Sequence, residues 1–235
     1  MDANPSTPPN AAQVTGILLW SLLPCLAIWV GVYIIGSAVW AYFLYHGLCL
    51  LPAIIWGRTL WQESLRLPTP KQLALLFLLA IFFSTVAVGG YELIGRKLLS
   101  DEQTLLLMKQ QGWFGNLFWP ISIYAVVVNP VVEELFWRGV VLNAVDAIKF
   151  PVKHFGIIWS SLVYAAFHYG IFRLVLFPGY AEVGIFVLAL YGAFLAIVYR
   201  KTGSIITTAI THGLLTDTAA LMLMLDLFRR HPNFM

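Results

Sequence analysis

The sequence predicts an all-α protein, a polytopic transmembrane helix bundle of about seven spans, within a range of six to eight. Hydrophobic residues make up 60% of the chain and charged residues 11%, whereas soluble domains average about 45–50% and about 25%. A soluble domain could not bury that much apolar surface in its own core, so lipid must be the solvent. The uncharged stretches that supply the spans are Ala3–Gly57, Gln72–Tyr91, Gln110–Val132, Phe155–Phe172, Val183–Tyr199 and Thr202–Thr216.

The first two spans lie in Ala3–Gly57. Because about 20 residues cross the hydrocarbon, this stretch is too long for one helix, and we expect a turn near Gly36–Ser37. The third span opens on Thr69, which can cap a helix, with Pro70 at the first helical position and Gln72 three residues after the cap. These signals predict a helix from Leu73 onward.

A short amphipathic helix precedes the fourth span. Ser100 offers a second cap, with Gln103 three residues later, and the sequence TLLLMKQQG follows and ends at Gly112. We expect this helix to lie at the membrane interface. Asn129-Pro130 then interrupts the fourth span, because proline cannot donate to the carbonyl four residues back. Broken backbone at membrane depth is tolerated only where protein or a water-filled cavity surrounds it.

Two adjacent glutamates follow this interruption, in the stretch NPVVEELFWRGVVL. Glu134 and Arg138 lie four residues apart and share a helix face, whereas Glu133 and Arg138 are separated by roughly 140°. Arg138 therefore neutralises Glu134 and leaves Glu133 without a local cation. Desolvation of such a carboxylate favours its protonated form, which suits a general base working near neutral pH. Ionisable groups in a span usually mark a functional site, and the alternative is a buried structural network.

Two histidines lie in later spans. His168 follows Tyr164 by one turn, and His212 precedes Thr216 by one turn. A single membrane histidine often does no more than bond a neighbouring helix, but two histidines and a carboxylate pair on different spans indicate a shared site. Asp217 lies roughly 140° from His212 on an α-helix and is a weaker candidate for the same cavity.

These motifs resemble those of the CAAX-protease and bacteriocin-processing family, also called the abortive-infection family, of glutamate-type intramembrane proteases. EELFWRG matches its Glu-Glu-x-x-x-Arg signature, and YAAFH resembles its Phe-x-x-x-His motif with Tyr164 in place of Phe. YRKTGSIITTAITHGLLTD is similar to its last motif, His-x-x-x-Asn or Asp, from which Thr216 departs. The resemblance covers about residues 113–226.

The resemblance implies an endopeptidase in which Glu133 and His168 activate a water. His212 and Thr216 would donate hydrogen bonds to the oxyanion, and Glu134, Arg138 and Tyr164 would support the site. We divide the chain into a disordered N-terminal tail (1–14), N-terminal membrane helices with the interfacial helix (15–112), a catalytic membrane core (113–226) and a C-terminal tail (227–235). The expected location is a prokaryotic plasma membrane.

Several alternatives stay open. Two histidines and a glutamate can bind catalytic zinc, although no cofactor is expected and the chain has no His-Glu-x-x-His. A non-catalytic immunity or scaffold protein of the same fold is a second alternative, which rests on Thr216. A proton-coupled transporter is a third, since buried Glu and His also form relays. The expected partners are membrane lipids and a peptide or protein substrate, with or without a lipid group. The net charge of +3 is spread over short loops, which predicts no nucleic-acid partner.

Overall fold

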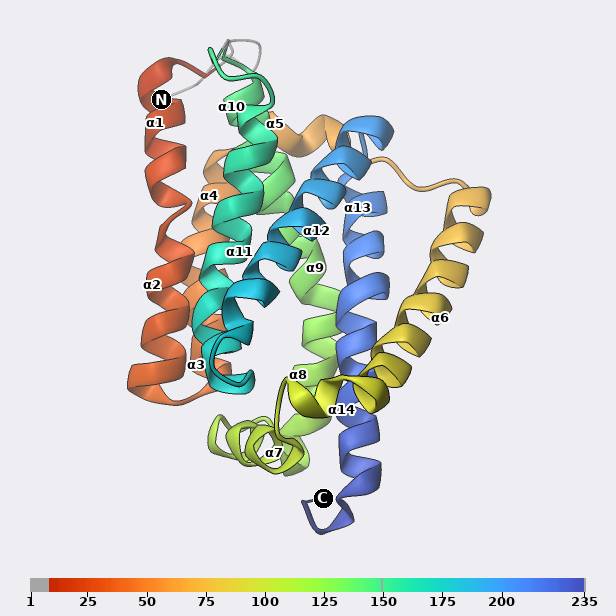
Figure 1. Ribbon diagram of the computed structural model, residues 1–235. Helices are drawn as coiled ribbons and strands as arrows, with labels where there is room; N and C mark the ends of the chain where they lie inside the picture. The colour runs from red at the N-terminus through yellow and green to blue at the C-terminus, as the bar shows by residue number, and fades with distance from the viewer. Residues whose placement is uncertain (1–8, 149, 235) are drawn as a thin grey trace.

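The computed structural model describes residues 9–148 and 150–234, and these residues form helices and no strand. Seven helical stretches are long and apolar enough to cross a membrane, which confirms the predicted all-α bundle and its seven spans (Figure 1). Four of the seven contain π-helical segments. The label η marks these segments (η1, η2, η6, η7 and η8) as well as the short 3₁₀ turns (η3, η4, η5 and η9). The spans are Ala11–Ile35, Ala38–Trp56, Pro70–Leu93, Gly115–Asp146, Phe155–Val175, Tyr180–Thr202 and Ile205–Arg230.

The first two spans pack against each other through a tight turn. Gly36 adopts φ 69°, a left-handed conformation that glycine adopts without strain, and Ser37 caps the following helix by accepting from the Trp40 amide. The predicted turn near Gly36–Ser37 is therefore confirmed. The elements up to the third span are α1 (Ala11–Trp20), α2 (Leu23–Trp29), η1 (Val30–Ile35), α3 (Ala38–Tyr42), η2 (Phe43–Leu50), α4 (Leu51–Trp56), α5 (Arg58–Trp61) and η3 (Gln62–Ser64).

The two predicted tails are shorter in the structure. Asn10 and Gln13 form a capping box that starts α1 at Ala11, so the last four residues of the tail predicted over 1–14 are helical. Residues 1–8 of that tail lie outside the described residues. At the other end, the last helix continues to Arg230, because Leu227 and Phe228 are buried against Phe118 and Tyr91. The C-terminal tail predicted from residue 227 therefore begins with helix.

The third span, α6 (Pro70–Leu93), is the most exposed span, as expected of a helix that faces lipid. Thr69 caps it in the predicted capping box with Gln72. The short helix α7 (Asp101–Gln110) follows, capped by Ser100 and ended at Gly112 with φ 75°. Figure 1 shows α7 lying across the lower end of the bundle instead of along it. The 3₁₀ turn η4 (Gly95–Lys97) joins the two helices.

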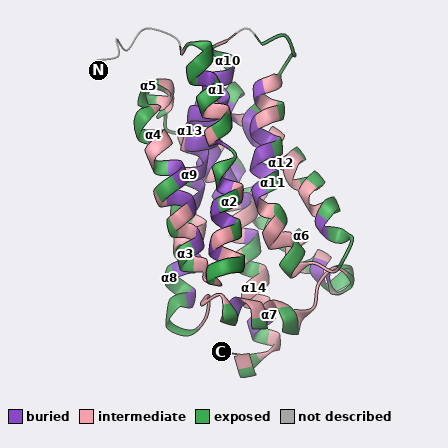
Figure 2. Cartoon of the chain, turned by 90° about the vertical axis from the view of Figure 1, so that its left-hand side faces the viewer, coloured by how far each residue is buried: buried purple, intermediate pink, exposed green. Residues whose placement is uncertain are grey.

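The buried centre of the bundle is formed by the fourth, fifth and seventh spans, as Figure 2 shows by colour. Trp137 and Phe167 stack there with ring centroids 5.9 Å apart, and the Trp137 indole donates to the Tyr45 hydroxyl at 3.3 Å. The remaining elements are η5 (Gly115–Leu117), α8 (Phe118–Ile123), η6 (Tyr124–Val128), α9 (Asn129–Glu134), η7 (Leu135–Leu142), α10 (Asn143–Asp146), α11 (Phe155–Val175), α12 (Tyr180–Thr202), α13 (Ile205–His212), η8 (Gly213–Asp217), α14 (Thr218–Arg230) and η9 (Pro232–Phe234).

The fourth span absorbs Pro130 without breaking. Pro130 occupies the first turn of α9, and the π-helical η6 ends immediately before it. A π-helical turn closes bonds from residue i to i+5, so the chain accommodates the proline by a change of helical pitch. The predicted interruption at Asn129-Pro130 is therefore a change from π-helix to α-helix inside one continuous span.

Candidate active site

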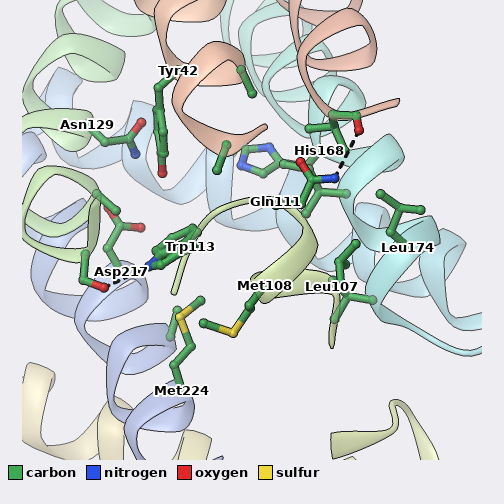
Figure 3. A pocket seen from close by; sticks show the side chains of 18 of the residues that line it. Tyr42, Leu107, Met108, Gln111, Trp113, Asn129, His168, Leu174, Asp217 and Met224 are labelled. Atoms are coloured by element: carbon green, nitrogen blue, oxygen red, sulfur yellow. Dashed lines mark hydrogen bonds between the residues drawn. The ribbon is translucent and has the colours of Figure 1, made fainter. Parts of the chain in front are cut away.

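A cavity of about 400 Å³ lies inside the bundle, between the first, second, fourth, fifth and seventh spans and beside α7 (Figure 3). Most of its lining is apolar, including Val126, Phe167 and Met224. Five of its lining residues carry an amide, an imidazole or a carboxyl group and come from four different parts of the chain. They are Gln111, Asn129, Glu133, His168 and Asp217.

Glu134 forms the predicted ion pair. Arg138 Nη1 donates to Glu134 Oε1 at 2.9 Å, and both side chains are fully buried. Arg138 Nη2 also donates to the Gly192 carbonyl at 2.8 Å, which ties the fourth span to the sixth. The guanidinium lies over the Tyr164 ring, 5.0 Å from its centroid. Breaking a buried pair by removing one partner costs about 3–5 kcal/mol, so Glu134 and Arg138 fix the local packing.

Glu133 differs from its neighbour although both are buried. Its side chain is 2% exposed and lines the cavity, which Glu134 does not. Within the described part of the chain, Glu133 Oε2 has no hydrogen-bond partner. The Nε2 atom of His212 lies 3.9 Å from Glu133 Oε2. Glu133 therefore presents a free carboxylate oxygen beside the cavity.

His212 belongs to the seventh span and contacts the fourth and fifth spans behind Glu133. Its Nδ1 lies 2.9 Å from Glu134 Oε1, and since a carboxylate only accepts, Nδ1 carries the proton of this bond. Its Nε2 lies 3.2 Å from the Tyr164 hydroxyl. His212 does not line the cavity itself. The ring borders the site through its contact with Glu133.

His168 lines the cavity from the fifth span. Its Nδ1 donates to the Tyr164 carbonyl at 2.9 Å, since a carbonyl oxygen only accepts. The other ring nitrogen, Nε2, is left as an acceptor in the neutral ring. The structure thus brings Glu133, His168 and His212 together, with Tyr164 between the two histidines.

Thr216 and Asp217 exchange the places that the sequence predicted for them. The Thr216 hydroxyl donates to the His212 carbonyl of its own helix at 2.9 Å, and Thr216 does not line the cavity. Asp217 does line it, and its Oδ1 lies 3.7 Å from His212 Nε2. The predicted separation of roughly 140° assumed an α-helix. Residues Gly213–Asp217 form the π-helix η8, whose i to i+5 spacing brings residue 217 back beneath residue 212.

Sequence reasoning missed two polar residues of the cavity, Gln111 and Asn129, and ranked a third, Asp217, as a weaker candidate. Asn129 and Asp217 had a signal, since each is a strongly polar group at an end of an uncharged stretch. Gln111 had no such signal, because it follows an amphipathic helix with several exposed polar residues, and nothing in the sequence distinguishes it from them. Two tyrosines, Tyr42 and Tyr45, also line the cavity.

The described residues contain no group of three or more His, Cys, Asp or Glu side chains arranged to hold a metal ion. His168 and His212 each use Nδ1 in a hydrogen bond within the protein. Each therefore offers only Nε2 for any further ligand.

The fold and the site define a class of protein, a polytopic membrane protein with ionisable side chains gathered at an internal cavity. A family model described as Type II CAAX prenyl endopeptidase Rce1-like matches residues 115–216. This match confirms the resemblance that the motifs predicted, over the segment that carries Glu133, His168 and His212. The family is a protease family, which supports an intramembrane protease function in general. The searches of curated proteins and of solved structures returned no match.

Proposed function

We propose that the protein is a glutamate-type intramembrane endopeptidase in which Glu133 activates a water for attack on a peptide bond. The observation that carries the proposal is the difference between two neighbouring glutamates. Oε2 of both glutamates is unpartnered among the described residues, but Glu134 is held through Oε1 by Arg138 and His212 and does not line the cavity, whereas Glu133 does. A general base needs a free oxygen within hydrogen-bond reach of the proton it takes, and Glu133 Oε2 offers such an oxygen to a water in the cavity.

In the proposed reaction, Glu133 takes a proton from the water while the oxygen attacks the scissile carbonyl. The Nε2 atom of His168 accepts the second hydrogen of the water and orients it, because Nδ1 is held by the Tyr164 carbonyl. When the tetrahedral intermediate collapses, the C–N bond breaks and the proton on Glu133 passes to the leaving amine. One residue thus serves first as base and then as acid.

The proposed oxyanion donor is the doubly protonated ring of His212, because Nδ1 already donates to Glu134 and Nε2 donates only when it carries a second proton. Glu134 holds its Nδ1, and the ring directs Nε2 toward Glu133 and the Tyr164 hydroxyl. A single donor of this kind lowers the barrier by about 2.7–4 kcal/mol in well-studied sites. The family pattern implies Thr216 as a second donor, and for this role its hydroxyl must leave the His212 carbonyl. Three residues act as positioning residues, because they contact His212 or Glu134 and do not line the cavity. They are Glu134, Arg138 and Tyr164.

The proposed substrate is a peptide or protein cut near its C-terminus or in its membrane-proximal part. The mostly apolar lining of the cavity suits a substrate with aliphatic side chains or a lipid group. We propose a prokaryotic plasma membrane as the location and membrane lipids as the surroundings, with no cofactor required.

The test compares cells that express the wild-type chain with cells that express Glu133→Gln at equal levels. New protein termini that appear only with the wild type, recovered by mass spectrometry of membrane-protein ends, would identify both the activity and its substrates. Identical sets of termini, together with no cleavage of hydrophobic peptides by the purified wild type, would refute the proposal.

The same preparations separate the alternatives. A transporter moves protons or solute across liposomes without cutting peptides. An immunity or scaffold protein protects or assembles its partner equally well as wild type and as Glu133→Gln. A zinc protease contains stoichiometric zinc and loses activity to a chelator until zinc is restored.

A further inference from the structure

Three hydrogen-bond acceptors of the cavity are buried and without a partner in the described part of the chain. They are Glu133 Oε2, Asp217 Oδ2 and Gln111 Oε1. Leaving such a group unsatisfied costs about 1–3 kcal/mol, and more when it is charged. Buried acceptors of this kind are rare in native proteins and require an explanation. Since all three line one cavity, a common ligand that supplies donors would satisfy them together.

Asp217 is held so that its second oxygen stays free. Oδ1 faces His212 Nε2 at 3.7 Å and the Thr216 hydroxyl at 3.5 Å, which leaves Oδ2 for the cavity. The π-helical turn η8 sets this direction, because it brings residue 217 under residue 212. The side chain is 19% exposed, so it is mostly withdrawn from solvent.

Gln111 is fixed on the other side of the cavity. Its side-chain Nε2 donates to the Val32 carbonyl at 3.2 Å, and its main-chain carbonyl accepts from the Ala38 amide at 2.8 Å. These two bonds join the end of α7 to the turn between the first two spans. They leave Gln111 Oε1 free. Figure 3 shows Gln111 and Asp217 on opposite sides of the cavity, with Trp113 and Met108 between them.

The chemistry of the missing donors points to a polypeptide main chain. An extended peptide offers one N–H per residue at intervals of about 3.3–3.6 Å, and its carbonyl groups cannot bond a carboxylate. We infer that Asp217 and Gln111 form a main-chain clamp, in which Asp217 Oδ2 and Gln111 Oε1 accept backbone N–H groups of the substrate on the two sides of the scissile bond. The clamp rests on the proposed protease function and adds two substrate-binding residues to it. Apolar lining between the two acceptors accommodates the side chains of that segment.

The test pairs protein variants with altered substrates. The probe is a quenched fluorogenic peptide that ends in Cys-aliphatic-aliphatic-X, with and without a farnesyl group, assayed in liposomes. In a series of analogues, one amide N–H at a time is replaced by an ester oxygen, and the scissile amide is kept. The protein variants are Asp217→Ala and Gln111→Met, which remove an acceptor, and Asp217→Asn, which keeps a carbonyl oxygen.

On the all-amide probe, we expect Asp217→Ala to lower kcat/KM about 10- to 150-fold and Gln111→Met about 2- to 10-fold, the values for a charged and a neutral acceptor. For each variant, one ester analogue should abolish the difference from wild type to within about 2-fold, since the lost N–H has no partner in either protein. The two analogues should differ, with one on each side of the scissile bond. Asp217→Asn should recover most of the loss seen with Asp217→Ala.

The controls are Gln110→Met, which changes the exposed neighbour of Gln111, and Asp146→Ala, which removes a carboxylate that pairs with Arg200 outside the cavity. Both should cleave as the wild type does. If thermal unfolding in detergent shows that Asp217→Ala fails to fold, the ester series on the wild type carries the test, since one analogue on each side of the scissile bond must then lose activity.

Two results overturn the clamp alone. One is undiminished kcat/KM in Asp217→Ala and Gln111→Met, and the other is a loss that every ester analogue leaves unchanged, which would place Asp217 in support of His212. If the wild type neither cleaves nor binds the probes, and Glu133→Gln does not bind them either, the proposed protease function fails and the clamp fails with it.

Discussion

Replacing Arg138 by leucine should destabilise the protein strongly. Leucine fills part of the same space but removes three interactions of the guanidinium. These are the 2.9 Å bond to Glu134, the 2.8 Å bond to the Gly192 carbonyl and the contact with the Tyr164 ring at 5.0 Å. Glu134 would then be a fully buried carboxylate with His212 as its only charged partner among the described residues.

The magnitude follows from the cost of an uncompensated buried charge. Breaking a buried pair costs about 3–5 kcal/mol, and the bond to Gly192 belongs to the same guanidinium and is largely contained in that figure. We therefore expect Arg138→Leu to lower the free energy of unfolding by about 3–5 kcal/mol. Arg138→Lys keeps the charge but cannot reach both partners in a fixed planar geometry, and it should lose less.

The assay is reversible unfolding of the purified protein in mixed micelles, followed by tryptophan fluorescence. A double-mutant cycle adds Glu134→Leu, alone and together with Arg138→Leu. The double variant should be more stable than the sum of the single losses predicts, because no charge is then stranded. Additive losses, or a loss below about 1 kcal/mol for Arg138→Leu, would show that the pair does not fix the site.

Other predictions address the interfacial helix, the π-helical turn and the metal. Burial alone would raise the pKa of Asp101, but the hydrogen bonds from Tyr91 and His231 and the charge of Arg230 outweigh it and hold the pKa below 3.8. The lowered pKa stabilises the folded state above the ordinary value of 3.8, and this stabilisation is lost as the pH falls toward the lower folded value. The protection of the α7 amides against hydrogen exchange should therefore fall only below about pH 4. Asp101→Asn should remove this transition. Gly213→Ala should lower the free energy of unfolding by about 1–3 kcal/mol and remove most of the peptide cleavage, since its Cβ would lie 2.7 Å from the Val126 carbonyl oxygen. The control Gly89→Ala on α6 meets no atom within 4 Å and should be tolerated. Equal stability of the two variants would contradict the packing. A strong zinc chelator should leave cleavage unchanged, and loss of activity that only zinc restores would favour the metal alternative.

The sequence predicted the spans and half of the site because these depend on local rules. Uncharged stretches near the length of a crossing gave the seven spans, and the i, i+4 rule gave the pair of Glu134 and Arg138. The pairing leaves Glu133 as the free carboxylate, and the structure places it at the cavity. The family motifs brought in His168 and His212, whose contacts with Tyr164 and Glu133 depend on packing between distant spans.

The parts that the sequence did not predict depend on non-local structure. The place of Asp217 follows from a π-helical turn, and no simple periodicity distinguishes that turn from an α-helix. Gln111 reaches the cavity because α7 is docked under the bundle by bonds to Val32 and Ala38, which lie more than seventy residues earlier. The helical start at Ala11 and the end at Arg230 show the usual uncertainty at helix ends, where a single cap or two buried side chains decide the boundary.

The most direct measurement is cleavage of a fluorogenic hydrophobic peptide by purified Glu133→Gln, beside the wild type and the surface control Glu63→Gln, with all three shown to unfold alike. If Glu133 is the base, its amide variant loses activity by a factor of at least about 100, the lower end expected for a positioned acid–base group, while Glu63→Gln cleaves at the wild-type rate. Cleavage by Glu133→Gln at the wild-type rate would contradict the assignment of Glu133 as the residue that activates the water.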